Sequence, residues 1–223
     1  MMLRMNLIAE LVPPQGTFSD KDADARLDAF RTALTGGDNA TLGEDLKTCA
    51  ARIDQARQKI GSGTEIYRVS ELMTLGQFGG ASIGAALARI CDDAAAESRA
   101  EALLVARFLV EIVFAAPHAP SLLPGDLLKQ HRLDRKSVSW PEVLPVYRDL
   151  LARASEAINR ADALGTRIAS PALRKMLLRH RIETLRQIAR LQDRDPASSG
   201  ARLTGIDKVM ISLRLFLRLR GRS

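Results

Sequence analysis

Apolar residues recur every three or four positions along most of the chain, as they do in amphipathic α-helices. In the segment 22–35, for example, Leu27, Phe30 and Leu34 fall on one stripe, and two glycines follow the segment. The same period predicts further helices at 41–60, 65–74, 81–91, 98–116, 125–133, 140–164, 171–191 and 206–220. No segment shows a convincing strand pattern. The predicted fold class is therefore all-α, with one helical domain.

The segment 98–116 is the most apolar of these helices and is predicted to lie at the centre of the fold. Pro117, Pro120 and Pro124 follow it and force a turn. The glycine-rich stretch 76–80 interrupts the helical pattern and predicts a break between two helices.

The amino-acid composition excludes several kinds of structure and site. Apolar residues make up 46% and charged residues 26% of the 223 positions, which is an ordinary globular balance. Two cysteines and three widely spaced histidines supply neither a disulfide framework nor a zinc cage. No apolar run reaches the roughly 18 residues that a membrane-spanning helix needs.

The formal charge of +7 is concentrated at the C-terminal end of the sequence. Between residues 202 and 223 there are six basic residues and one acidic residue, a local excess of five positive charges. The rest of the chain is nearly neutral, so specific nucleic-acid binding is not the favoured interpretation.

The same C-terminal segment is predicted to form a basic amphipathic helix. Its apolar side chains recur at helical spacing, and this stripe could simply pack on the bundle. A wider apolar surface beside arginines also fits docking on a protein partner or on an anionic membrane. The residues predicted to dock are Arg214, Phe216, Arg218, Arg220 and Arg222.

A family resemblance rests on several motifs in order. Residues 123–133 read Leu-Pro-Gly-Asp-Leu-Leu-Lys-Gln-His-Arg-Leu, and a small-residue helix at 81–91 precedes the apolar helix. This order resembles the squalene/phytoene synthase family over residues 46–219. The resemblance implies a helical bundle of the isoprenoid synthase type, shortened at its N-terminus. It gives an N-terminal extension at 1–20, the synthase-like domain at 21–200 and the basic helix at 201–223.

The metal-binding motifs of that family are incomplete in this chain. The active enzymes ionise an allylic diphosphate on Mg²⁺, which is held by an Asp-x-x-x-Asp pair on each of two facing helices. The second pair falls on Glu111 and Ala115, and Val110 stands where an arginine is usual. No equivalent of the first pair is found at 20–28. The resemblance therefore implies a non-catalytic protein without a metal or cofactor, in which Glu111 is a buried remnant paired with a basic residue.

Three functions remain open from the sequence. Non-catalytic relatives of the family include an assembly factor of mitochondrial respiratory complex I. By this resemblance we expect an assembly factor or accessory subunit that binds protein subunits of a larger complex, on the matrix side of the mitochondrial inner membrane or, alternatively, in a bacterial cytoplasm. The first alternative is an active squalene- or phytoene-forming prenyl transferase. The second is a basic helical module in an RNA–protein assembly.

The remaining candidate groups have structural interpretations. Asp92 and Asp93, with Glu97, are predicted to form a solvated helix end rather than a metal site. Cys49 and Cys91 fall on apolar stripes and are predicted to be buried. His131 is predicted to be structural, and Trp140 a packing anchor. Ser19 or Asp20 is a predicted helix cap, and the acidic run 20–28 a helix start.

Overall fold

The computed structural model describes residues 8, 11–14, 16–36, 42–165, 167–198, 200–207 and 210–211. Within these ranges the chain is helical and contains no strand, so the predicted all-α class is confirmed. The α-helices are α2 (Lys21–Leu34), α3 (Glu44–Gly61), α4 (Val69–Gly76), α5 (Ser82–Ile90), α6 (Glu97–Ala115), α7 (Gly125–Gln130), α8 (Leu144–Ala163) and α9 (Pro171–Leu191).

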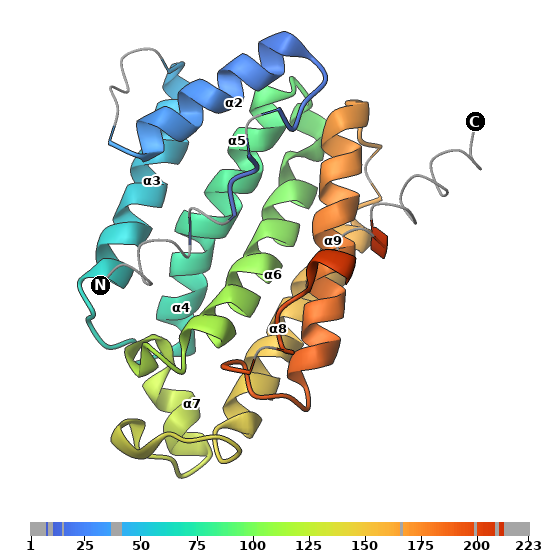
Figure 1. The fold of residues 1–223 in the computed structure, drawn as a ribbon. Helices are drawn as coiled ribbons and strands as arrows, with labels where there is room; N and C mark the ends of the chain where they lie inside the picture. The colour runs from blue at the N-terminus through green and yellow to red at the C-terminus, as the bar shows by residue number, and fades with distance from the viewer. Residues whose placement is uncertain are drawn as a thin grey trace.

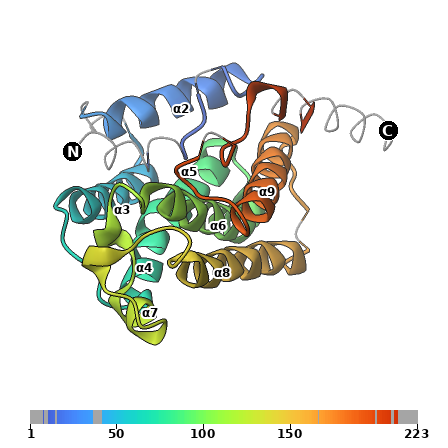
Figure 2. The same ribbon diagram turned by 60° about the horizontal axis from the view of Figure 1, so that its bottom comes forward.

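The helix α6 lies in the middle of the bundle and packs against α5, α8 and α9 (Figures 1 and 2). The helix α2 crosses one end of the bundle over α3 and α5, and α7 lies at the opposite end (Figure 1). Phe108, Leu109 and Ile112 of α6 are fully buried. A helix that is apolar on nearly all sides must be enclosed by others, so the central position predicted for 98–116 is confirmed.

The predicted break at residues 76–80 is wrong. Here α4 continues into α5 through a π-helical segment, Gln77–Ala81. Gly80 and Gly84 lie against the backbone of α6. A Cβ added at Gly80 would lie 2.6 Å from Leu104 O, and one added at Gly84 would lie 2.5 Å from Ala100 C. These two glycines therefore provide space for a close helix–helix approach, and Gly76 itself has ordinary helical dihedral angles.

The predicted helix at 65–74 begins later, at Val69. Residues just before it pair with the proline-rich turn instead: Ile66 N–H donates to Ser121 O at 2.9 Å, and Ile66 O accepts from Gly125 N–H at 3.0 Å. The Asp126 carboxylate then accepts the N–H of Val69 at 3.0 Å and so satisfies the free amide at the start of α4. The backbone N–H and carbonyl of Ile66 and the carbonyl of Tyr67 are thus used between segments rather than within a helix.

Other boundaries differ by a few residues. The helix predicted at 140–164 begins at Leu144, and the one predicted at 125–133 ends at Gln130 because Arg132 takes a left-handed conformation with φ 57°. The prediction for 171–191 matches α9 at both ends. Asp20 caps α2, as predicted, by accepting the N–H of Asp22 at 2.9 Å. Within the described residues, no helix is both long and apolar enough to cross a bilayer.

Candidate functional site

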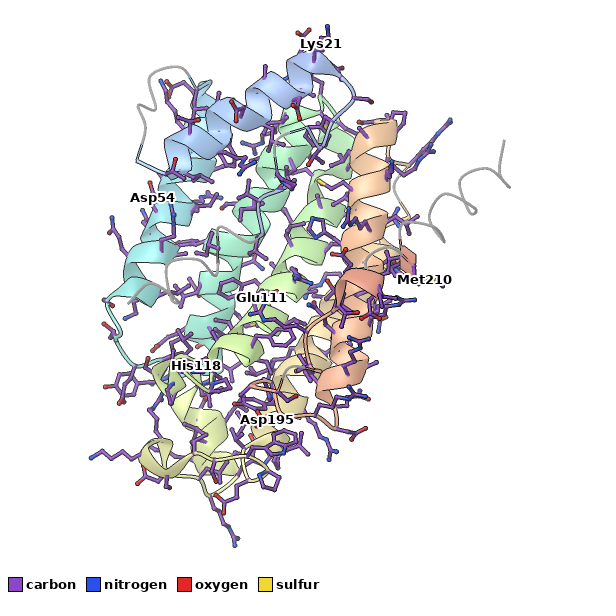
Figure 3. The ribbon with its side chains drawn as sticks, in the orientation of Figure 1. Lys21, Asp54, Glu111, His118, Asp195 and Met210 are labelled. Carbon is purple, nitrogen blue, oxygen red and sulfur yellow. The ribbon has the colours of Figure 1, made fainter. Side chains whose placement is uncertain are left out.

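Glu111 is a buried carboxylate in the C-terminal half of α6, with only 2% of its side chain exposed (Figure 3). Its Oε1 lies 2.7 Å from Nη2 of Arg107, one helical turn earlier. Its Oε2 lies 3.6 Å from Nη1 of Arg202, which follows α9. The guanidinium of Arg202 also stacks over the Phe114 ring, 4.6 Å from its centroid. The prediction that Glu111 is buried and paired with a basic residue is confirmed.

The two other positions that the family resemblance assigns to a metal motif, Val110 and Ala115, carry no metal ligand. Ala115 is half-buried and Val110 is fully buried, and neither side chain has an oxygen. Across the described part of the chain, no group of three or more His, Cys, Asp or Glu side chains could hold a metal ion. Glu111 thus faces two arginines, Arg107 and Arg202.

A pocket of about 510 Å³ opens beside this ion pair, between α6, α9 and two flanking segments. Arg107 of α6 forms part of its wall. The flanking residues are 12–14 and Thr17, before α2, and 202–203, after α9. Along α9 the lining side chains repeat with helical spacing, and they are Met176, Arg179, His180, Glu183 and Gln187.

Hydrogen bonds hold the polar side chains of this pocket in place. Arg107 donates to the buried Gln187 Oε1, which links α6 to α9. Arg179 donates from Nε to Glu183 Oε1 at 2.8 Å, within α9. Its two terminal nitrogens make no hydrogen bond to any described residue and are available to a ligand.

His180 also lies in the wall of this pocket. Burial, and secondly the positive charge of Arg107, lower the pKa of His180 to about 4. Its Nδ1 is buried and has no hydrogen-bond partner among the described residues. An unsatisfied buried nitrogen beside a pocket marks a place where a ligand or water can supply the missing bond.

A second pocket of about 280 Å³ lies between α3, the π-helical segment and the start of α6. Arg89 forms a forked ion pair with Glu97 across it, at 2.7 and 3.2 Å. Burial and the neighbouring Glu97 raise the pKa of Glu101. Because both glutamates are on α6 and are four positions apart, helical spacing could have singled them out in the sequence.

The structure separates the acidic residues that were grouped in the sequence. Asp92 is exposed and pairs with Arg26 at 2.9 Å. Asp93 is buried, so its predicted solvation is wrong, because its carboxylate accepts the Ser170 N–H at the start of α9 at 2.9 Å. Glu97 is engaged by Arg89.

The remaining predictions concern two cysteines, a histidine and a tryptophan. Cys49 is buried, as predicted, and burial raises the pKa of its thiol. Cys91 is half-buried rather than buried, and burial raises the pKa of its thiol to about 11. His131 Nε2 lies 2.7 Å from Asp149 Oδ2, a contact that joins α7 to α8. Trp140 is partly buried against the core.

The sequence did not single out the α9 face of the larger pocket. Its signal was present as a polar stripe, since Arg179, Glu183 and Gln187 are four positions apart. The docking residues predicted at the C-terminus lie outside the described residues, and they are Arg214, Phe216, Arg218, Arg220 and Arg222.

No family model, curated protein or solved structure matches this chain.

Proposed function

We propose that this chain is a non-catalytic protein of the squalene/phytoene synthase type, and that it works by binding other proteins. In this proposal it is an assembly factor or accessory subunit of a respiratory complex, at the matrix face of the mitochondrial inner membrane or, alternatively, in a bacterial cytoplasm. The observation that carries the proposal is the state of Glu111, which is buried between Arg107 and Arg202.

This arrangement opposes the chemistry of the active enzymes. Mg²⁺ needs several oxygen ligands with free lone pairs, and it is repelled by nearby cations. Glu111 directs both of its oxygens at guanidinium groups, and Ala115 offers none. Releasing Glu111 to a metal would break a buried ion pair, which costs on the order of 3–5 kcal/mol. These residues therefore support a role in binding other proteins rather than in ionising a diphosphate.

The packing beside α6 supports the same proposal. Joining two isoprenoid chains requires an apolar cavity large enough to hold them. In the described bundle, α6 meets the π-helical segment at Gly80 and α5 at Gly84, in both places backbone to backbone. The pocket of about 510 Å³ beside α6 has arginines, a histidine and a glutamate in its wall.

A surface suited to docking lies beside α9. Residues 205–207 and 210–211 are helical, and within them Ile206 is 78% and Met210 42% exposed (Figure 3). Asp207 holds this segment to α9 through Arg190, with Oδ1 2.7 Å from Nη2. Apolar side chains held in solvent beside basic ones are typical of contact surfaces for proteins or anionic membranes.

The proposal is tested by whether the protein associates with a respiratory complex in its own cells. Tagged full-length protein should migrate on native gels with a respiratory complex or one of its assembly intermediates, and deletion of the gene should reduce that complex. The double variant Ile206→Ser, Met210→Ser should lose the association. The matched control is Leu164→Ser, which alters an exposed leucine at the end of α8.

Two results would overturn the proposal. One is normal assembly of every respiratory complex in the deletion strain, with the tagged protein migrating alone. The other is turnover of farnesyl or geranylgeranyl diphosphate with Mg²⁺ by the purified chain, if Glu111→Gln abolishes it.

A further inference from the structure

We propose that the pocket between α3, the π-helical segment and the start of α6 binds a free α-amino acid with an apolar side chain. Arg52 of α3 holds the carboxylate of this ligand, and Glu101 of α6 holds its ammonium group. The inference does not depend on the proposed function, because this pocket shares no residue with the docking surface at Ile206 and Met210 or with the ion pair of Glu111.

The first argument is that two opposite charges in the pocket wall lack a described partner. Within the part of the chain that the structure describes, neither Arg52 nor Glu101 makes a hydrogen bond or an ion pair. The two side chains come from helices on either side of α5, which packs against both α3 and α6 (Figure 1). A ligand that carries both signs can satisfy both groups at once.

The second argument is that the other charged groups of the wall are already committed. Arg89 donates from Nε and Nη2 to the Glu97 carboxylate, at 3.2 and 2.7 Å. Its Nη1 donates to Asp45 O at 3.1 Å, which ties α5 to the start of α3. An arginine that is bound on both sides of its guanidinium is fixed before any ligand arrives. Arg52 is therefore the guanidinium of this wall that is left to bind a carboxylate.

The third argument is the balance of charge. The pocket wall has two arginines and two glutamates, so its formal charge is zero. An ion of one sign would leave one of the two open groups unmatched, whereas a zwitterion matches both. Burial, and secondly the negative charge of Glu97, raise the pKa of Glu101, as is usual for a carboxylate without a close counter-charge. The ammonium group of an amino acid supplies that charge.

The fourth argument is the size and the apolar part of the pocket. Its volume of about 280 Å³ lies at the lower end of small-molecule sites, which suits a ligand as small as an amino acid. Phe78, Ala81 and Ala85 add apolar surface to the wall, and this surface suits an aliphatic side chain. Phe78 and Ala81 belong to the π-helical segment, a kind of turn that recurs at functional sites.

The experiment is an NMR titration of the isotope-labelled full chain with three related compounds. They are L-leucine, 4-methylpentanoate, which is leucine without its amino group, and 3-methylbutylamine, which is leucine without its carboxylate. We expect L-leucine to bind saturably and about tenfold more tightly than either analogue. The reason is that each analogue leaves one charged group of the wall without its hydrogen bond.

Two variants separate the roles of the two charged residues. Glu101→Gln should weaken the binding of L-leucine about tenfold and leave the affinity for 4-methylpentanoate unchanged, because that analogue has no ammonium group to lose. Arg52→Gln should weaken L-leucine to a similar extent and leave the affinity for 3-methylbutylamine unchanged. A variant that fails to fold would instead lose all three compounds, and circular dichroism identifies it.

The matched controls remove one charge of each sign outside the pocket. Lys59→Gln changes an exposed cation near the end of α3, and Glu156→Gln changes an exposed carboxylate on α8. Neither should alter the affinity for L-leucine. Three results would overturn the proposal: no saturable binding of L-leucine, L-alanine or L-phenylalanine, binding of either analogue as tight as that of L-leucine, or equal weakening in the control variants.

Discussion

Gly84 is the residue at which a single methyl group should disturb the bundle most. An added Cβ would lie 2.5 Å from Ala100 C and 2.5 Å from Glu101 N, both of them backbone atoms of α6. No side chain can rotate away to make room. Ordinary contact begins at 3.4 Å, so α5 and α6 would have to separate by about 0.9 Å (3.4 − 2.5).

The size of the effect follows from two opposing terms. Overpacking of this kind costs up to about 3 kcal/mol. Alanine is a better helix former than glycine by about 1 kcal/mol, which offsets part of that cost. We therefore expect Gly84→Ala to lower the free energy of unfolding by about 2 kcal/mol, and the melting temperature by about 4–8 °C for a domain of this size.

The assay is thermal and urea unfolding followed by circular dichroism at 222 nm. Gly61→Ala is the matched control, because Gly61 ends α3 with open space at its Cβ position. Its melting temperature should stay the same or rise. If Gly84→Ala is as stable as the native chain, the close contact of α5 and α6 is not as described.

Three further predictions concern α6 and the pocket. Leu109→Ala should cost about 2–5 kcal/mol in chemical denaturation, because Leu109 is fully buried and its loss leaves a cavity; a neutral result would place this face of α6 at the surface. Glu111→Gln should cost about 3 kcal/mol by the same measurement, since Arg107 and Arg202 lose a buried counter-charge; an unchanged midpoint would mean that the pair adds nothing. His180 has a pKa of about 4 when folded and 6.5 when unfolded, so the unfolded state binds more protons between these values and stability should fall as the pH drops from 6.5 to 4. His180→Gln should flatten that pH dependence, and an identical profile in the variant would refute the assignment.

The helices that could be predicted well are those with a continuous period and clear ends. The segment 171–191 is an example, because Ser170 and Pro171 provide a cap and a first-turn proline that local chemistry alone specifies. The central position of α6 could also be predicted, since almost every side chain from 102 to 114 is apolar.

The errors have a common physical cause, which is that a distant segment decided the local structure. The glycines at 79–80 signal a break in isolation, but α6 passes close enough to stabilise a helix through them. Asp93 is a polar residue at a helix end by sequence, and it is buried because α9 begins beside it. Glu111 could be predicted to pair with Arg107 by helical spacing, whereas Arg202 lies far along the chain and has no local signal.

Adjacent carboxylates at the corner between α5 and α6 form a single junction that holds both α2 and α9. Asp92 holds α2 through Arg26, 66 positions earlier, and Asp93 holds the first turn of α9, 77 positions later. The left-handed backbone at Asp92, with φ 50°, turns the chain at this junction. Contacts between residues this far apart in the sequence carry a large loop-closure entropy. We therefore expect α5 and α6 to pair first, and α2 and α9 to dock afterwards on this corner, each held by its own carboxylate.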